Sequence, residues 1–279
     1  MSGYHSRAVY RLSKSKLMSA LQWGKRLYLE IHSPDLAQIE AGLQARFDVG
    51  HRVGEVARSL HRHGRLIGHA DDPSAALEET KRALECGDDV LLFEPAFEHG
   101  GVLVRADMLF RRHGRCRLVE VKATTSVADH HLQDAAIQAW VIDGAGCPVD
   151  AVSIAHLDGA FVYPGGDNYR GLFSYVDVTQ DIASLRAQVP ALALRGQQIL
   201  GGPAPSIAVG RQCREPYSCP FLSRCDRDAP TYPLSMLGQH WRLRERLAAL
   251  GYRDLRDVPE SEIGDGLPRR IWSAVVNGE

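Results

Sequence analysis

Residues 102–125 alternate apolar and polar side chains on both sides of a turn at residues 112–114. Alternation with a period of two is typical of β-strands, so this segment predicts two strands joined as a hairpin, the first running unbroken through Asp107. Successive side chains of a strand point to opposite faces of a sheet. When the apolar faces of the two strands are paired, Asp107, Glu120 and Lys122 lie together on the other face.

Two carboxylates and an ammonium group on rigid strands could hold a hard divalent cation and a water molecule. The alternative is a hairpin whose outer face is simply charged and solvated. The second strand is rich in valine, which predicts a central position in a sheet. A Glu-x-Lys pair on a central strand requires a reason, and this favours a functional site formed by Asp107, Glu120 and Lys122.

The composition is that of an ordinary globular protein, with 279 residues, 44% hydrophobic and 24% charged. It allows one elaborated domain or two smaller ones. The formal net charge of −1 provides no overall attraction to nucleic acid, so any such site must be a local patch. No apolar run approaches the length of a membrane span, and the first residues lack a signal-peptide core. We therefore expect a cytoplasmic protein with no membrane partner.

Basic side chains concentrate in residues 12–30, where a helix capped by Ser13 or Ser15 is predicted. This segment is either a solvated amphipathic helix or a lobe that contacts the phosphates of a nucleic acid. Arg105, on the same predicted face as Asp107, extends the candidate nucleic-acid contacts. The full set is Lys14, Lys16, Lys25, Arg26 and Arg105.

Helices are also predicted over residues 43–63, 72–86, 132–143 and 179–200, and strands over residues 90–93, 151–157, 161–163 and 172–178. These elements predict an α/β (α+β) fold with a mixed central sheet flanked by helices. His51 and Glu55 lie one helical turn apart in the first of these helices, and Asp134 and Gln138 in the third. Such residues are more often solvated than functional when they are considered singly.

Three cysteines follow a break at residues 201–205, namely Cys213, Cys219 and Cys225. Three thiols within thirteen residues point to a soft metal or an iron–sulfur cluster. A zinc site is weakly indicated because no CxxC pair is present. Beyond them, residues 233–279 predict two short helices around a Leu-Gly-Tyr sequence.

An Asp followed by Glu-x-Lys on the next strand resembles the catalytic motif of the PD-(D/E)XK, or restriction-endonuclease-like, nucleases. Residues 50–57, with the pattern G-H-x-x-G-E-x-A, resemble the first motif of the RecB-like branch of that superfamily. The resemblance implies that Asp107, Glu120, the Val121 carbonyl and His51 bind Mg²⁺ or Mn²⁺. It also implies catalytic roles for Asp107, Glu120, Lys122 and Gln138, with Glu55 orienting His51.

The cysteines resemble those of the iron–sulfur RecB-like exonucleases that accompany CRISPR adaptation, and more closely those of a related uncharacterised bacterial family. In these proteins one N-terminal and three C-terminal cysteines hold a [4Fe-4S] cluster. The chain departs from this pattern at Trp23, where the N-terminal cysteine is expected, and Cys86, Cys116 and Cys147 are single residues and poor substitutes. Three cysteines with another fourth ligand, a zinc site or no metal therefore remain alternatives.

The resemblance implies a nuclease core with an N-terminal helical lobe over residues 1–200, a cysteine-rich loop over 201–232 and a small helical module over 233–279. It implies a metal-dependent exonuclease acting on single-stranded DNA ends, with DNA-repair or CRISPR-type protein partners. Two alternatives stay open. One is a nucleic-acid-binding protein that has lost catalysis, and the other is a metal- or redox-sensing interaction protein.

Overall fold

The computed structural model describes residues 10–38, 41–87, 89–207, 209–227 and 230–278. These residues form two compact units, each with its own core. The first unit takes its described residues from 1–32 and 39–204, and the second from 33–38 and 205–279.

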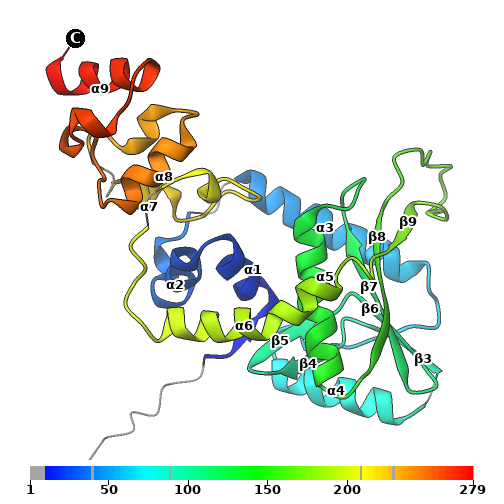
Figure 1. Cartoon of the computed structure of the whole chain (residues 1–279). Coiled ribbons are helices and arrows are strands. Elements are labelled where there is room, and N and C mark those ends of the chain that lie inside the picture. Colours follow the sequence, from blue (N-terminus) through cyan, green and yellow to red (C-terminus); the bar gives the residue numbers. More distant parts are fainter. Residues whose placement is uncertain (1–9, 39–40, 88, 208, 228–229, 279) are drawn as a thin grey trace, which may run out of the picture. The chain divides into compact units, whose positions relative to one another are not determined.

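The first unit is built on a mixed sheet whose described strands follow the order β2-β3-β6-β7-β8-β9 (Figure 1). Its pairs are antiparallel except for β2 with β3 and β7 with β8. The predicted mixed sheet flanked by helices is confirmed, and so is the central position of the Glu-x-Lys strand. The strands are β2 (Arg65–Leu66), β3 (Asp89–Phe93), β6 (Met108–Arg112), β7 (Arg115–Lys122), β8 (Val149–Leu157) and β9 (Phe173–Asp177).

A smaller sheet contains β1 (Leu12–Ser13), β5 (Val102–Arg105) and β4 (Ala96–His99), in the order β1-β5-β4. The predicted unbroken first strand of the hairpin is therefore wrong, because β5 and β6 belong to different sheets and the chain crosses between them at residues 106–107. The crossing is held by two backbone hydrogen bonds, from the Ala106 N–H to the Pro95 carbonyl and from the Glu94 N–H to the Asp107 carbonyl. Period-two alternation continues across such a short interruption, so sequence alone does not reveal it.

Two helices cover opposite faces of β7, namely α5 (Asp129–Gly144) and α3 (Ala41–Ser59). Leu118 packs in a core cluster with Ala135 and other α5 residues, whereas Val119 packs in another with Ala57 of α3. Both faces of β7 are consequently buried, as expected of a central strand. The helix predicted over residues 72–86 is α4 (Pro73–Glu85), and the Asp72 side chain caps it by accepting hydrogen bonds from the Ser74 and Ala75 N–H groups.

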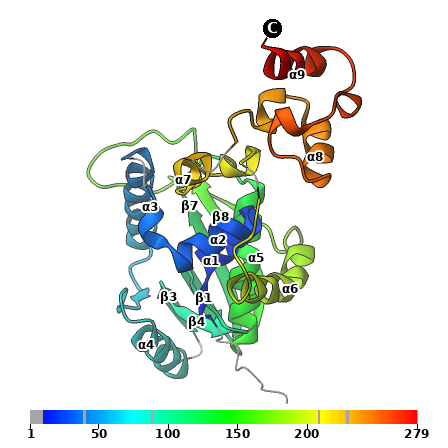
Figure 2. The same cartoon turned by 90° about the vertical axis from the view of Figure 1, so that its left-hand side faces the viewer.

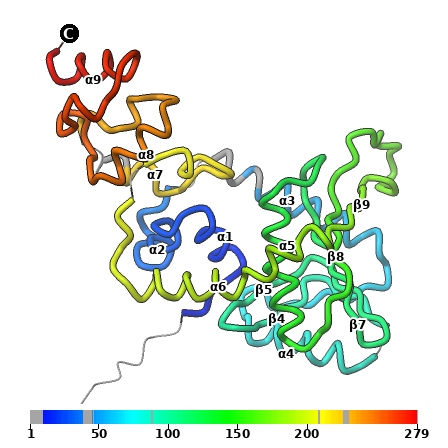
Figure 3. Tube along the Cα trace, viewed as in Figure 1, coloured from blue at the N-terminus to red at the C-terminus, as the bar shows by residue number. Residues whose placement is uncertain are grey.

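The N-terminal segment forms two helices instead of one, α1 (Lys14–Gln22) and α2 (Gly24–His32), which meet at Trp23. Both contact α6 (Ala183–Leu200), far away in the sequence (Figures 2 and 3). Leu12, Leu17 and Leu27 are buried in this contact. Gly196 of α6 allows it, because a Cβ there would lie 3.1 Å from a Leu12 methyl carbon.

Two smaller predictions are wrong. Residues 161–163 form no strand and lie in an irregular connection between β8 and β9. Helix α6 begins at Ala183 and not at Thr179, since the Thr179 hydroxyl instead accepts a 2.9 Å hydrogen bond from the Val152 N–H of β8.

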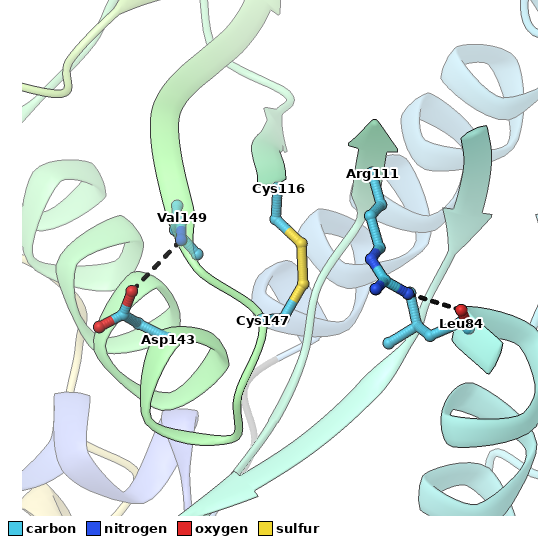
Figure 4. The surroundings of a disulfide bond; sticks show 6 residues. All are labelled: Leu84, Arg111, Cys116, Asp143, Cys147 and Val149. Carbon is cyan, nitrogen blue, oxygen red and sulfur yellow. Dashed lines mark hydrogen bonds between the residues drawn. A yellow bond between two sulfur atoms is a disulfide. The ribbon is translucent and has the colours of Figure 1, made fainter. Parts of the chain in front are cut away.

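A disulfide joins Cys116 of β7 to Cys147, in the connection between α5 and β8 (Figure 4). Both cysteines are buried, and their Cα atoms lie 6.2 Å apart. Beside it, the Asp143 carboxylate accepts a 3.3 Å hydrogen bond from the Val149 N–H. The disulfide therefore ties the strand of the Glu-x-Lys motif to the segment that follows α5. The sequence did not predict this bond.

The second unit is made of short helices around a core that includes Leu237, Leu247 and Leu255. Helix α8 (Trp241–Ala249) ends just before the Leu-Gly-Tyr sequence of residues 250–252, and α9 (Leu267–Asn277) comes later in the chain. No helix in the described ranges is long and apolar enough to cross a membrane. The helical elements are η1 (Pro34–Leu36), η2 (Arg211–Cys213), α7 (Leu222–Arg227), η3 (Leu234–Leu237), α8 (Trp241–Ala249), η4 (Leu255–Asp257), η5 (Glu260–Glu262) and α9 (Leu267–Asn277).

Candidate active site

Strand β7 places Glu120 and Lys122 on the face that α5 covers, two residues apart and pointing the same way. The Lys122 Nζ donates a 2.7 Å hydrogen bond to Glu120 Oε1. The Glu120 side chain is only 3% exposed. A carboxylate removed from water at this depth requires partners, and the neighbouring elements supply them.

Helix α5 contributes Asp134 and Gln138, which share a face because they are one turn apart. The Gln138 Nε2 donates a 2.6 Å hydrogen bond to Glu120 Oε2 and a 3.4 Å one to Asp134 Oδ1. Asp134 also forms an ion pair with Lys122. No role was predicted for Asp134 from the sequence, although its four-residue spacing from Gln138 was a usable signal.

Asp107 lies in the crossing between β5 and β6, beside β7. Its Oδ2 accepts a 2.7 Å hydrogen bond from the Val121 N–H, in the middle of the Glu-x-Lys motif. This bond explains how Asp107 joins the site although it is not part of a strand. The predicted grouping of Asp107, Glu120 and Lys122 is thus reached by a different backbone route.

Lys14, the first residue of α1, also enters this cluster. Its Nζ lies 3.1 Å from Glu120 Oε1 and 3.1 Å from Asp134 Oδ1. From the sequence, Lys14 was expected either on a solvated amphipathic helix or in a lobe that contacts phosphates. In the structure it is instead an ion-pair partner within the candidate site.

The charges of the cluster are unevenly balanced, because the described side chains bring three carboxylates against two ammonium groups. Burial, and then the charge of Glu120, raise the pKa of Asp107 to about 7 against the opposing effects of Lys14 and Lys122. Burial also works against the charge of Glu120, but Lys122 and Lys14 outweigh it and hold the pKa of Glu120 well below its ordinary range. Among the described residues, Asp107 is thus the carboxylate of the cluster that forms no direct ion pair.

Lys122 keeps its proton in this setting. Burial disfavours its charge, but Glu120 and then Asp134 outweigh burial and hold the pKa of Lys122 above the ordinary lysine value. Burial also disfavours the charge of Lys14, but the charges of Asp134 and then Glu120 outweigh burial and raise the pKa of Lys14. In this arrangement Lys122 can donate hydrogen bonds and offset negative charge, but it cannot accept a proton from water.

The structure does not bring His51 into the cluster. His51 and Glu55 are exposed on α3, and α3 packs on the β7 face that carries Val119 and Val121. Within the described residues, no group of three or more His, Cys, Asp or Glu side chains is close enough to hold a metal ion. Hence His51, Asp107 and Glu120 do not form a ready three-ligand site.

The remaining donors nevertheless suit Mg²⁺ or Mn²⁺ chemically. Asp107 and Glu120 offer hard oxygen ligands, and the described contacts of Asp107 leave its Oδ1 without a protein donor. Burial and the charge of Glu120 raise the pKa of Asp107, so nearby positive charge would favour its ionised form. A divalent cation on Asp107, Glu120 and the Val121 carbonyl would supply that charge, with water or phosphate oxygens as further ligands.

The three cysteines of the second unit are differently arranged. Cys213 and Cys219 are buried and Cys225 is half-buried, and the Cys219 N–H donates a 2.8 Å hydrogen bond to the Cys213 carbonyl. In the part of the chain that is described, these side chains do not form a group that could hold a metal ion. As placed they do not fit a [4Fe-4S] cluster or a zinc ion, which stay predictions from the sequence.

The other predicted nucleic-acid contacts lie in the first unit, mostly with partners of their own. Lys16 and Arg26 both pair with Glu30, at 3.1 Å and 2.8 Å. Arg105 donates to the carbonyls of residues 67–69, the shortest bond being 2.9 Å, and so holds the connection after β2. Lys25 is half-buried on α2. Nucleic-acid contact by these side chains stays a prediction.

Comparisons with known proteins add little to this picture. No family model matches the chain. A protein of Ureaplasma parvum serovar 3, described as the uncharacterised protein UU173, is 25% identical over 95 residues, covering 32% of this chain and 14% of that protein. The chain thus spans about a seventh of the length of that relative. A solved structure described as SSO0001 shares 14% identity and a TM-score of 0.37, over 81% of this chain and 90% of the other. At that TM-score the likeness supports neither a family nor a function.

Proposed function

We propose that this chain is a metal-dependent nuclease of the PD-(D/E)XK type, which hydrolyses phosphodiester bonds of DNA. One observation carries the proposal. The Asp107 carboxylate is held by the Val121 N–H immediately beside Glu120, while Lys122 lies on the same face of β7 as Glu120. Two carboxylates and an ammonium group at this spacing are the residue types that metal-assisted hydrolysis of a phosphodiester requires.

Each side chain of the cluster has a role in this proposal. A Mg²⁺ or Mn²⁺ ion held by Asp107, Glu120 and the Val121 carbonyl would polarise the scissile phosphate and acidify a nearby water. Lys122 keeps its charge, so it orients the water and offsets charge developing on the phosphate oxygens. Asp134 and Gln138 hold Lys122 and Glu120 in these positions.

The substrate preference rests on the order of the sequence motifs. DNA with single-stranded ends, exonuclease action and DNA-repair or CRISPR-type partners all belong to the RecB-like resemblance. A cytoplasmic location is likewise proposed from the sequence.

A second candidate is a nucleic-acid-binding protein that has lost catalysis. The observation in its favour is that Glu120 already has two ammonium partners, at 3.1 Å and 2.7 Å, and an amide partner at 2.6 Å. A carboxylate satisfied in this way could serve as a structural ion pair. The two candidates differ in whether divalent metal binds to Asp107.

The test is cleavage of end-labelled single- and double-stranded DNA in the presence of Mn²⁺. We expect degradation by the wild type that Asp107→Ala and Lys122→Ala abolish. Asp150→Ala is the matched control, because Asp150 is exposed on β8 and forms an ion pair with Arg115, away from the cluster. A wild type that cuts neither DNA nor RNA, or variants that cut equally well, would overturn the nuclease proposal.

A further inference from the structure

Lys14 is held at the active site by the backbone around it. Just before it, β1 pairs in parallel with β5, with Leu12 opposite Val102 and Ser13 opposite Leu103. The Ser13 hydroxyl accepts a 3.3 Å hydrogen bond from the Lys16 N–H and so caps α1. Lys14 therefore begins its helix beside the strand that leads to Asp107, and its position is determined by the fold.

The buried side chains on either side strengthen this placement. Leu12 and Leu17 are 1% and 0% exposed and belong to the main core of the first unit. Between them the Lys14 side chain leaves the core and reaches Glu120 and Asp134. A lysine that served only as a solvated helix residue would not be bordered by fully buried leucines while pointing at two carboxylates.

The hydrogen bonds of Glu120 show what Lys14 does there. An ionised carboxylate offers about four lone-pair directions. Lys14 and Lys122 both donate to Oε1, and Gln138 donates to Oε2. Lys122 is part of β7 and has Asp134 as a second partner, so it cannot move far. Lys14 reaches the same oxygen from a separate element, α1, and is slightly more exposed than Lys122, at 24% against 19%.

We propose that Lys14 is an internal counter-cation, which occupies part of the divalent-metal site in the metal-free protein and competes with the metal for Glu120. This inference rests on the proposed function in one respect, namely that Asp107 and Glu120 bind a divalent cation. Metal and Lys14 both neutralise the same carboxylates, so each weakens the binding of the other.

Lys14 is suited to leave when the metal binds. Its ammonium group stands on a flexible four-carbon chain, and its side chain is 24% exposed, so a path to solvent exists. Asp134, its other partner, retains Lys122 and Gln138. Displacement thus leaves each carboxylate of the cluster with a hydrogen-bond donor among the described residues.

The test is direct titration of the full-length, metal-free protein with Mn²⁺, followed by electron paramagnetic resonance of the free ion. Lys14→Met removes the charge and keeps the aliphatic chain, and Lys14→Gln is a second neutral variant that can still donate to the carboxylates. Lys16→Met is the matched control. It lies on the same helix, is similarly exposed at 27% against 24%, and pairs with Glu30, which is not part of the cluster.

We expect both Lys14 variants to bind Mn²⁺ about tenfold more tightly than the wild type, a common size for coupling between two ligands. Lys16→Met should bind as the wild type does. Thermal unfolding provides a second measurement. Without metal, Lys14→Met should melt below the wild type, and saturating Mn²⁺ should close the gap, whereas the loss of a purely structural lysine would leave the gap unchanged.

The outcomes separate this inference from the proposed function. Wild-type Mn²⁺ binding that Asp107→Ala abolishes but the Lys14 variants leave unchanged or weaken would overturn the role of Lys14 alone. Equal tightening by Lys16→Met would also overturn it, since general charge would then explain the effect. If neither the wild type nor the Lys14 variants bind Mn²⁺, the metal site itself fails, and the inference fails with it.

Discussion

The carboxylates around β7 and the cysteines of residues 213–225 both suggest metal binding in the sequence, but only the first set forms a cluster in the described structure. The difference follows from the backbone that carries them. Glu120 and Lys122 share a face because a strand has a period of two, and Asp134 and Gln138 because a helix repeats nearly every four residues. The cysteines, in contrast, are distributed over η2, an irregular segment and α7, which impose no common face.

The largest expected difference between the two regions is in catalysis. Glu120→Gln keeps the shape of the side chain and removes its charge, and we expect Mn²⁺-dependent DNA cleavage to fall by at least about a hundredfold. Cys219→Ser should leave the cleavage rate near that of the wild type. Initial rates on one labelled substrate measure both variants. An equal loss in Cys219→Ser would show that the cysteine segment contributes to catalysis.

The buried ion pairs of the cluster should contribute more to the free energy of unfolding than an exposed ion pair does. Lys122→Met leaves Glu120 and Asp134 with only Lys14 for compensation, and breaking such a buried ion pair costs about 3–5 kcal/mol of the free energy of unfolding. Arg115 lies on β7, as Lys122 does, and forms an exposed ion pair with Asp150 of β8. Arg115→Met breaks this pair and should cost less than about 1 kcal/mol of the free energy of unfolding. Urea unfolding of metal-free protein gives both values. Similar costs would mean that the cluster is far more solvated than the structure shows.

The disulfide offers a smaller test of the site framework. Its cysteines are 31 residues apart, and loss of a bridge of this kind costs about 2–4 kcal/mol of stability. Cys116→Ser should therefore unfold at lower urea concentration than the wild type under oxidising conditions. Under reducing conditions the two proteins should behave alike. Alkylation of the protein unfolded without a reductant, followed by mass spectrometry, checks the bond directly, because both cysteines are buried in the folded state. Two alkylated thiols at these positions would contradict it.

The pH dependence of stability provides a finer comparison. The pKa of Asp107 is raised from 3.8 to about 7 in the folded protein, so between these values the folded state binds more protons than the unfolded state. Stability contributed by this group is complete at low pH and is lost as the pH rises toward 7, by at most about 1.4 kcal/mol per pH unit. Asp107→Asn should remove that slope. Urea unfolding in the presence of a chelator, across this window, measures it in both proteins, and parallel curves would contradict the prediction.

The smallest effect is expected at the cysteines themselves. Because the three thiols do not form a group that could hold a metal ion in the described residues, a variant with serine at Cys213, Cys219 and Cys225 should contain as much iron and zinc as the wild type after anaerobic purification. Elemental analysis and the visible absorption spectrum decide this. A brown wild type whose colour and iron disappear in the variant would support the iron–sulfur cluster that the sequence predicts. Both regions would then be expected to bind metal.

Much of the site was predictable from local patterns. The alternation in residues 115–122 predicted a strand with Glu120 and Lys122 on one face, and its valines predicted a central position. The four-residue spacing placed Asp134 with Gln138. His51 was predicted on a helix, but the sequence contained no signal for which face of the sheet that helix would cover. The crossing at Asp107 escaped prediction because alternation does not distinguish one strand from two.

The sequence determined the elements whose geometry repeats over short distances, because a strand or helix imposes its own spacing on the side chains it carries. The tertiary structure alone decided which separate elements meet. The pairing of β1 with β5 brings Lys14 to Glu120, the Val121 N–H holds Asp107, and Cys147 reaches Cys116. Each of these contacts joins residues well separated in the chain, and its existence depends on burial of the whole core, which no local pattern encodes.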